Sequence, residues 1–240
     1  MPDMIPRPQP TAFALAIGLS LSLSACGGGN SASNATSDNG VFASSSDTPT
    51  GDAPKTAAPT LAQGPDVCFR AIAKQLGADV KVSEINSFFS PGSKIDASDD
   101  EPEGELTTCS VKYQNPEDPR KLLSISMDTH TGTFGKPAPV EISVSGGDAS
   151  KFKLEDILIP LSTVNAAGLT SIMESQKAKL SSVYSHYAWS GVRLLSPRFS
   201  DVHTLRVDVD GRLASNDIKE NGYLSILTDG KTVKINRLTP

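Results

Sequence analysis

The chain has 240 residues, of which 38% are hydrophobic, and it carries 22 Lys or Arg against 27 Asp or Glu for a formal net charge of −5. This mild acidic excess without a basic stripe argues against nucleic acid as a partner. No apolar run follows the one near the N-terminus, which argues against membrane insertion beyond an N-terminal anchor.

The first 25 residues have the order of parts of a signal peptide. Arg7 supplies a positive start, and an apolar stretch extends from Thr11 to Leu23 before a pair of small residues. A membrane-spanning helix needs about 20 apolar residues, whereas a signal-peptide core needs roughly 7 to 15. We therefore predict that residues 1–25 are a cleaved signal peptide.

The residues at the predicted cleavage site are Leu23, Ser24, Ala25 and Cys26. This sequence resembles the lipobox of bacterial lipoproteins, and the resemblance covers residues 1–26. In that family the cysteine thiol is alkylated with diacylglycerol, the peptide is cut before it, and the new N-terminus is acylated, commonly with palmitate. The resemblance implies lipidation of Cys26. Gly27, in place of Asp, implies sorting to the periplasmic face of the outer membrane. The alternative is an ordinary secretory signal with an incidental cysteine.

A polar segment separates Cys26 from the rest of the chain. Residues 26–64 are rich in Gly, Ser, Ala, Asn, Thr and Pro, and Val41, Phe42 and Leu61 are almost their only large apolar side chains. Such a composition cannot bury enough surface to offset the entropy of ordering. We predict a flexible tether with a typical span of about 35 Å.

Residues 65–240 are expected to form one α+β periplasmic domain, with possible halves at 65–150 and 151–240. In the first half, Asp66 precedes apolar residues at helical spacing, which predicts a helix over 67–76. Ser83 is interpreted as the cap of a short helix reaching 89. Alternating apolar residues predict three strands, at 107–113, 122–127 and 140–144. The loop 115–119 is expected to join the first two as an antiparallel pair.

The second half repeats this layout. A long helix is expected to begin at 163–165 and to continue to Tyr187, and strands are expected over 189–195 and 203–209. The clearest hairpin spans 223–237. If Asp229 and Gly230 form a two-residue turn, Ile226 lies opposite Val233 and Leu224 opposite Ile235. The predicted fold is thus two successive helix-plus-antiparallel-meander units.

Three cysteines are present. With Cys26 lipidated, Cys68 and Cys109 remain as one pair in an oxidising compartment, and both lie on the inward faces of their predicted elements. We predict a disulfide between them, which closes a loop of about 40 residues and contributes roughly 3 to 4 kcal/mol. The alternative is two buried thiols, and a metal site lacks the expected CxxC spacing.

Motifs for catalysis or cofactor binding match poorly. Gly230-Lys231-Thr232 ends like a phosphate loop, but position 225 is Ser where Gly is required, so a hairpin turn explains the glycine better. Asp208, Asp210 and Gly211 resemble part of a calcium loop, yet its first ligand position would be Arg206; a strand ending in an Asp-Gly turn fits better.

The three histidines, His130, His186 and His203, show no metal-ligand spacing. Asp201 and His203 can face the same way on a strand, but the sequence points to no nucleophile beside them. We therefore expect no catalytic residue, no metal and no cofactor, and a protein that is not an enzyme.

One acidic cluster is a candidate interaction site. It comprises Asp96, Asp99, Asp100, Glu101, Glu103 and Glu105. The ordinary interpretation of such a run is a solvated surface. The sharper hypothesis is a recognition loop for a basic protein, with Asp99, Asp100, Glu101 and Glu103 as partner-binding residues. Calcium binding ranks third, because the spacing of the carboxylates is irregular.

A tethered, disulfide-linked domain without catalytic motifs resembles, in architecture alone, the immunity lipoproteins that inhibit secreted antibacterial effectors. An envelope-assembly factor is the alternative, and both imply a periplasmic protein partner. A lipid or small-ligand carrier would need an apolar pocket lined by the side chains Phe88, Phe89, Met173 and Leu180. An enzyme would need His186 or His203 beside a carboxylate and a nucleophile.

Overall fold

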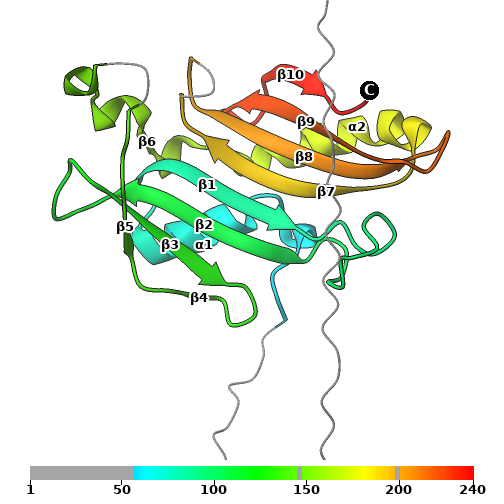
Figure 1. Cartoon of the computed structure of the whole chain (residues 1–240), viewed down its shortest axis with the longest axis horizontal. Helices are drawn as coiled ribbons and strands as arrows, with labels where there is room; N and C mark the ends of the chain where they lie inside the picture. Colours follow the sequence, from blue (N-terminus) through cyan, green and yellow to red (C-terminus); the bar gives the residue numbers. More distant parts are fainter. Residues whose placement is uncertain (1–56, 145–147, 198–200) are drawn as a thin grey trace, which may run out of the picture. The chain divides into compact units, whose positions relative to one another are not determined.

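The computed structural model describes residues 57–144, 148–197 and 201–240 (Figure 1). The predicted signal peptide, Cys26 and the tether up to residue 56 lie outside these ranges. All described elements belong to one compact unit.

A single 10-stranded antiparallel sheet organises this unit, with the order β10-β9-β8-β7-β1-β2-β3-β4, while β5 pairs with β3 and β6 with β1. The strands are β1 (Lys81–Phe89), β2 (Leu106–Gln114), β3 (Leu122–Asp128), β4 (Thr133–Phe134), β5 (Ala138–Val140), β6 (Ile159–Pro160), β7 (Tyr184–Leu195), β8 (Thr204–Leu213), β9 (Lys219–Leu227) and β10 (Val233–Arg237). The predicted α+β class is confirmed, and each half contributes a helix followed by an antiparallel meander.

Two α-helices, α1 (Val67–Leu76) and α2 (Leu169–Val183), lie behind the same face of the sheet in Figure 1. Their apolar faces pack on inward side chains of the strands in one core, which contains Ile72, Leu169, Leu180, Val207 and Leu224, each 0% exposed. Neither helix covers the opposite face. The short 3₁₀ helices are η1 (Leu61–Gln63), η2 (Ala149–Lys151), η3 (Leu154–Ile157), η4 (Leu161–Thr163) and η5 (Ala166–Gly168).

The two halves meet at the centre of this sheet. β1 pairs with β7 from Ile85 opposite Leu194 to Phe88 opposite Gly191. Both halves therefore contribute to one sheet, and each meander continues outward from the central pair.

The short helix predicted over 83–89 is wrong, because these residues belong to β1. Ile85, Phe88 and Phe89 fit helical spacing as well as a strand, which made the period ambiguous. Ile85, Ser87 and Phe89 are buried on one face, and hydrogen bonding to both β2 and β7 satisfies the backbone of this central strand.

Other boundaries also differ from the prediction: α2 ends at Val183, and Tyr187, which was expected in this helix, belongs to β7. The strand expected over 140–144 is only β5, and Val144 is 38% exposed, so its alternating pattern has no surface to pack against. α2 begins at Leu169 because Asn165 caps η5 by accepting a hydrogen bond from the Gly168 amide. β8 continues through Gly211 to Leu213, where an Asp-Gly turn was expected; the Tyr184 ring occupies the space beside this glycine.

The C-terminal hairpin is confirmed in part. Ile226 lies opposite Val233, but a bulge then places Ile235 opposite Ser225 instead of Leu224. The Leu227 amide donates to the Thr232 carbonyl, and the Asp229 carboxylate accepts from two amides inside the loop, so the connection is wider than two residues. Leu238 is fully buried, whereas Val233 and Ile235 are exposed.

The folded unit begins before the predicted boundary at Pro65. Ala58 is buried, the Leu61 amide donates to the Gly104 carbonyl, and Thr60 forms an isolated bridge with Glu105. The last residues assigned to the tether therefore pack on the β1–β2 connection.

The predicted disulfide is confirmed. Cys68 on α1 and Cys109 on β2 are bonded, with their Cα atoms 5.5 Å apart, and both side chains are buried. This bond fastens the first helix to the sheet.

Candidate functional site

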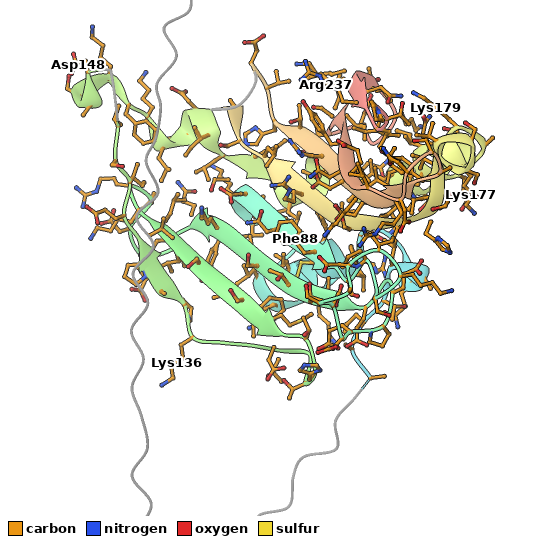
Figure 2. All side chains as sticks on the ribbon, turned by 45° about the vertical axis from the view of Figure 1, so that its right-hand side comes forward. Phe88, Lys136, Asp148, Lys177, Lys179 and Arg237 are labelled. Carbon is orange, nitrogen blue, oxygen red and sulfur yellow. A yellow bond between two sulfur atoms is a disulfide. The ribbon has the colours of Figure 1, made fainter. Side chains whose placement is uncertain are left out.

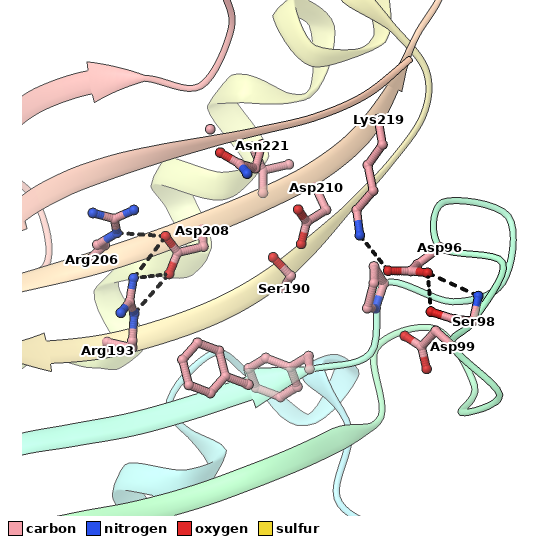
Figure 3. A pocket seen from close by; sticks show the side chains of 15 residues that line it. Asp96, Ser98, Asp99, Ser190, Arg193, Arg206, Asp208, Asp210, Lys219 and Asn221 are labelled. Atoms are coloured by element: carbon pink, nitrogen blue, oxygen red, sulfur yellow. Dashed lines mark hydrogen bonds and ion pairs between the residues drawn. The ribbon is translucent and has the colours of Figure 1, made fainter. Parts of the chain in front are cut away.

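The open face of the sheet contains a hollow of about 580 Å³ over β1, β7, β8 and β9 (Figure 3). The connection between β1 and β2, residues 90–105, borders it. We call this hollow the open-face groove; it is lined by Phe88, Phe89, Pro91, Asp96, Ser98, Asp99, Ser190, Arg193, Arg206, Asp208, Val209, Asp210, Lys219, Asn221 and Gly222.

Strand alternation and register bring the polar side chains of the groove together. Arg206, Asp208 and Asp210 stand two residues apart on β8, so their side chains share one face. Across the sheet, Asp208 lies opposite Tyr223 on one side and Gly191 on the other. Gly191 in turn lies opposite Phe88. The result is a cross-strand row that runs over four strands.

Gly191 has no side chain, which leaves room for the side chains of Asp208 and Phe88 in this row. A Cβ atom there would lie 2.8 Å from an Asp208 carboxylate oxygen and 3.3 Å from the Phe88 ring. Both neighbours occupy the space above the glycine, so a larger residue would force them apart.

The charged centre of the groove consists of Arg193, Asp208 and Arg206. Arg193 donates to both carboxylate oxygens of Asp208, at 3.0 and 3.2 Å, and Arg206 Nε donates at 2.7 Å. We call these three residues the Arg–Asp–Arg cluster. Because one carboxylate serves two guanidinium groups, the cluster keeps one positive charge.

Each guanidinium group of the cluster lies over an aromatic ring. The Arg193 guanidinium lies 5.4 Å from the ring centre of Phe88, and that of Arg206 lies 3.8 Å from the ring centre of Tyr223. Both are cation–π distances, and these contacts together with the hydrogen bonds to Asp208 restrict the orientation of each arginine. The cluster is therefore a preorganised feature of the face.

Further along the groove, Asp210 lies near Ser190 and Asn221 (Figure 3). Within the described ranges, the carboxylate of Asp210 accepts no hydrogen bond and forms no ion pair, and the side chains of Ser190 and Asn221 also make no hydrogen bond. The nearby cation Lys219 is engaged with Asp96. This end of the groove therefore presents uncommitted polar atoms.

The acidic connection supplies one wall of the groove and a rim. Lys219 and Ser98 donate to Asp96, and the hydrogen bond from Lys219 is the main reason that the pKa of Asp96 lies well below its ordinary value. The Asp99 carboxylate accepts from the Ser90 hydroxyl at 2.8 Å and from two backbone amides. These two aspartates thus hold the connection in shape.

Of the four predicted partner-binding residues, Asp99 is used within the connection, while Asp100, Glu101 and Glu103 are exposed. Glu105 is half-buried beside the Thr60 bridge. The structure therefore leaves three of the predicted carboxylates accessible on the connection that borders the groove, and none of the three lines the groove itself.

The histidines are not brought together. His203 is half-buried, its Nε2 lies 3.1 Å from the Ile157 carbonyl, and burial lowers its pKa. It shares a hollow of about 480 Å³ with Asp201. His186 is exposed and lines a separate hollow with Glu103. Among the residues described, no group of three or more His, Cys, Asp or Glu could hold a metal ion.

The apolar pocket expected for a carrier is not assembled from the predicted side chains. Phe88 and Phe89 line the open-face groove, Met173 lines another hollow, and Leu180 is fully buried in the core. Neither described helix is long and apolar enough to cross a membrane.

Sequence reasoning assigned no binding role to Arg193, Arg206 or Asp208, and it named Phe88 only as a possible wall of an apolar ligand pocket. The available signal was the alternation of Arg206, Asp208 and Asp210 with buried valines, which marks a strand with one charged face. The pairing of β1 with β7, which brings Phe88 to this face, has no local signal.

Comparisons of the chain with protein-family models, with curated protein sequences and with solved structures find no match.

Proposed function

We propose that the folded unit is a protein-binding domain and that the open face of the sheet is its binding surface. The observation that carries this proposal is the Arg–Asp–Arg cluster stacked on Phe88 and Tyr223. Arginine and tyrosine are enriched at the centres of protein interfaces, where rigid side chains lose little entropy on binding. A helix-free face that displays both in fixed positions is well suited to this role.

The chemistry of the groove favours a macromolecular partner over a small apolar ligand. Small-molecule pockets are lined mainly by hydrophobic and aromatic side chains with few polar groups. The open-face groove is lined instead by four aspartates, two arginines and a lysine. Charged surfaces of this kind select partners and accelerate association.

The N-terminal sequence supports an anchored location for this domain. In the proposal, Cys26 carries the lipid at the periplasmic face of the outer membrane, and the polar segment after it lets the domain reach partners nearby. An inhibitor of a secreted antibacterial effector is the function we favour, on architecture. An envelope-assembly factor uses the same surface and anchor.

Capture of partners from the cell envelope tests the binding surface. The full-length protein is compared with Asn221→Trp, which adds bulk at an exposed position on the open face, and with Lys179→Trp, an exposed position on α2. Figure 2 shows Lys179 on the helix, away from Phe88. After chemical cross-linking and mass spectrometry, the native protein and Lys179→Trp should recover one stoichiometric partner that Asn221→Trp loses. Equal recovery by Asn221→Trp would reject the open face as the binding surface.

The identity of the partner separates the two functions. A secreted enzyme or toxin whose activity falls on binding supports the inhibitor, whereas a resident envelope-complex protein supports the assembly factor. The anchor is tested separately with Cys26→Ala, which should abolish metabolic labelling with palmitate and recovery in the outer-membrane fraction. Retained labelling would show that Cys26 is not the lipid site.

A further inference from the structure

We propose that the Asp210 end of the open-face groove receives a lysine or arginine side chain of the partner protein, with Asp210 as its counter-ion. This inference deepens the proposed function, on which it rests, by naming the chemistry of the partner. It concerns one pocket within the wider face.

Asp210 differs from every other carboxylate in the groove. Asp208 is held by two arginines, Asp96 by Lys219, and Asp99 by Ser90 and backbone amides. Asp210 is half-buried between β7 and β9, opposite Ala188 and Asn221, and no side chain in the described ranges pairs with it. Its carboxylate oxygens are therefore available to accept charge-assisted hydrogen bonds from a cation of the partner.

The cationic side chains of the groove form their ion pairs with carboxylates other than Asp210. Arg193 and Arg206 share Asp208, and Lys219 is bonded to Asp96. None of the three neutralises Asp210. The uncommitted oxygen atoms of Ser190 and Asn221 can accept further hydrogen bonds from an incoming ammonium or guanidinium group.

The remaining walls fit the stem of a long basic side chain. Phe88 and Pro91 supply apolar surface within the same groove. Lysine and arginine place their methylene groups along such surface while the charged head reaches a polar group. The exposed carboxylates of Asp100, Glu101 and Glu103 do not line the groove, but they lie on the connection that borders it and add negative charge that attracts a basic segment.

The opposite assignment, an acidic side chain from the partner, fits this end poorly. An incoming carboxylate near Asp210 would add a second negative charge beside an unpaired one. The charged N–H donors that would bind a carboxylate lie on the Arg–Asp–Arg cluster and not at the Asp210 end of the groove.

The test is an NMR titration of residues 27–240, which include all of the described compact unit. The probes are three capped pentapeptides, acetyl-Gly-Gly-X-Gly-Gly-amide, in which X is arginine, citrulline or glutamate. Citrulline has nearly the shape of arginine but no charge. The arginine peptide should give saturable amide shifts at Ser190, Asp210 and Asn221, with about tenfold higher affinity than the citrulline peptide.

Two variants locate the counter-ion. Asp210→Asn should lower the affinity for the arginine peptide about tenfold. Asp156→Asn, which removes the same charge at an exposed position on η3 that does not line the groove, should change it less than about twofold. Equal binding of the arginine and citrulline peptides, unchanged affinity in Asp210→Asn, or the absence of saturable shifts would overturn the inference.

The outcomes separate this inference from the proposed function. If cross-linking loses a partner in Asn221→Trp while the arginine peptide fails to bind, the face binds a protein but Asp210 does not take a basic side chain. If the arginine peptide binds at Asp210 and no protein is captured through this face, the inference that Asp210 binds a basic side chain is supported and the proposed protein-binding function is rejected.

Discussion

Arg193 on β7 meets Asp208 on β8 through two hydrogen bonds, from Nε to Oδ2 at 3.0 Å and from Nη2 to Oδ1 at 3.2 Å. Both side chains are mostly shielded from solvent, with 23% and 16% of their surfaces exposed. This two-pronged pair fixes the plane of the guanidinium above Phe88, so the position of Arg193 depends on the carboxylate of Asp208.

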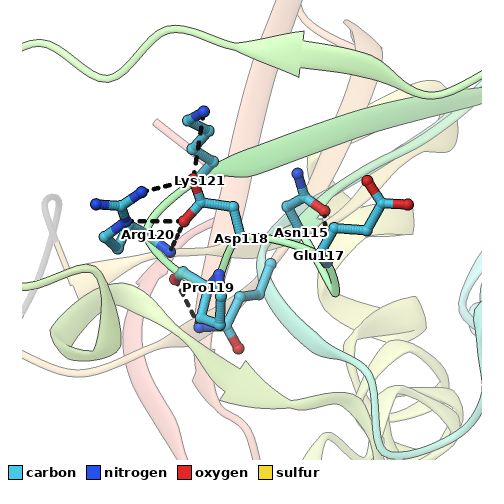
Figure 4. A network of polar contacts seen from close by, with 7 residues as sticks. Asn115, Glu117, Asp118, Pro119, Arg120 and Lys121 are labelled. Atoms are coloured by element: carbon cyan, nitrogen blue, oxygen red, sulfur yellow. Dashed lines mark hydrogen bonds and ion pairs between the residues drawn. The ribbon is translucent and has the colours of Figure 1, made fainter.

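Asp208→Asn should destabilise the domain by about 1–3 kcal/mol, because two partly buried guanidinium groups lose the charge they share. Urea denaturation measures the difference. The matched control is Asp118→Asn in the β2–β3 turn, where Arg120 makes the same two-pronged contact at 2.9 and 3.0 Å but is 87% exposed (Figure 4). The control should leave the midpoint almost unchanged. Equal effects of the two variants would contradict the structural role of Asp208.

Gly191→Ala should destabilise the fold by about 1–3 kcal/mol, since its new methyl group would collide with Asp208 and press on the Phe88 ring. Gly135→Ala provides the comparison, because a Cβ there lies 3.6 Å from the Ser126 carbonyl, at ordinary contact distance. Thermal unfolding of both variants measures the difference, and the midpoint should fall more in Gly191→Ala than in Gly135→Ala. A stable Gly191→Ala protein with an unchanged Arg193 environment would mean that the row is not tightly packed.

Removal of the disulfide by Cys68→Ala with Cys109→Ala should lower the free energy of unfolding by roughly 4 kcal/mol, from the entropy of the open loop in the unfolded chain. The two residues are 41 apart in sequence. Guanidinium denaturation of the double variant should agree with that of the native protein under reducing conditions. A loss below about 1 kcal/mol would show that the bond constrains the unfolded chain little.

The Asp96–Lys219 pair gives a pH dependence of defined sign. The hydrogen bond from Lys219 depresses the folded-state pKa of Asp96 below its ordinary value of 3.8. Folding stability from this pair is therefore complete above that value and is lost as the pH falls through the acidic range below it. The stability of the native protein should fall more steeply than that of Asp96→Asn below about pH 4 and in parallel with it above about pH 5. Parallel curves throughout would show that the pair is not formed in solution.

Local patterns in the sequence predicted many elements of the fold. The helix at 67–76 and the strands of the meanders follow apolar periodicity, and the disulfide follows the cysteine count. The prediction failed at β1, where Ile85, Phe88 and Phe89 fit two periods, and at the β9–β10 hairpin, where a bulge shifts the register. Both errors arise because tertiary packing decides between locally equivalent conformations.

The open-face groove was harder to foresee for a different reason. Its acidic rim is contiguous in sequence and was therefore visible. Phe88 and Arg193 are distant in the chain, and only the pairing of β1 with β7 makes them neighbours. A single sequence contains no rule that states which distant strands become adjacent.

The central pairing of β1 with β7 also has a consequence for the order of events during synthesis. One edge of β1 finds β2 soon after it is made, but the other edge waits for a partner that follows about 100 residues later. Until β7 emerges, a hydrophobic strand destined for the middle of the sheet has an unpaired edge that can associate with other chains. Proteins that shield nascent strands would be most needed by this molecule in that interval.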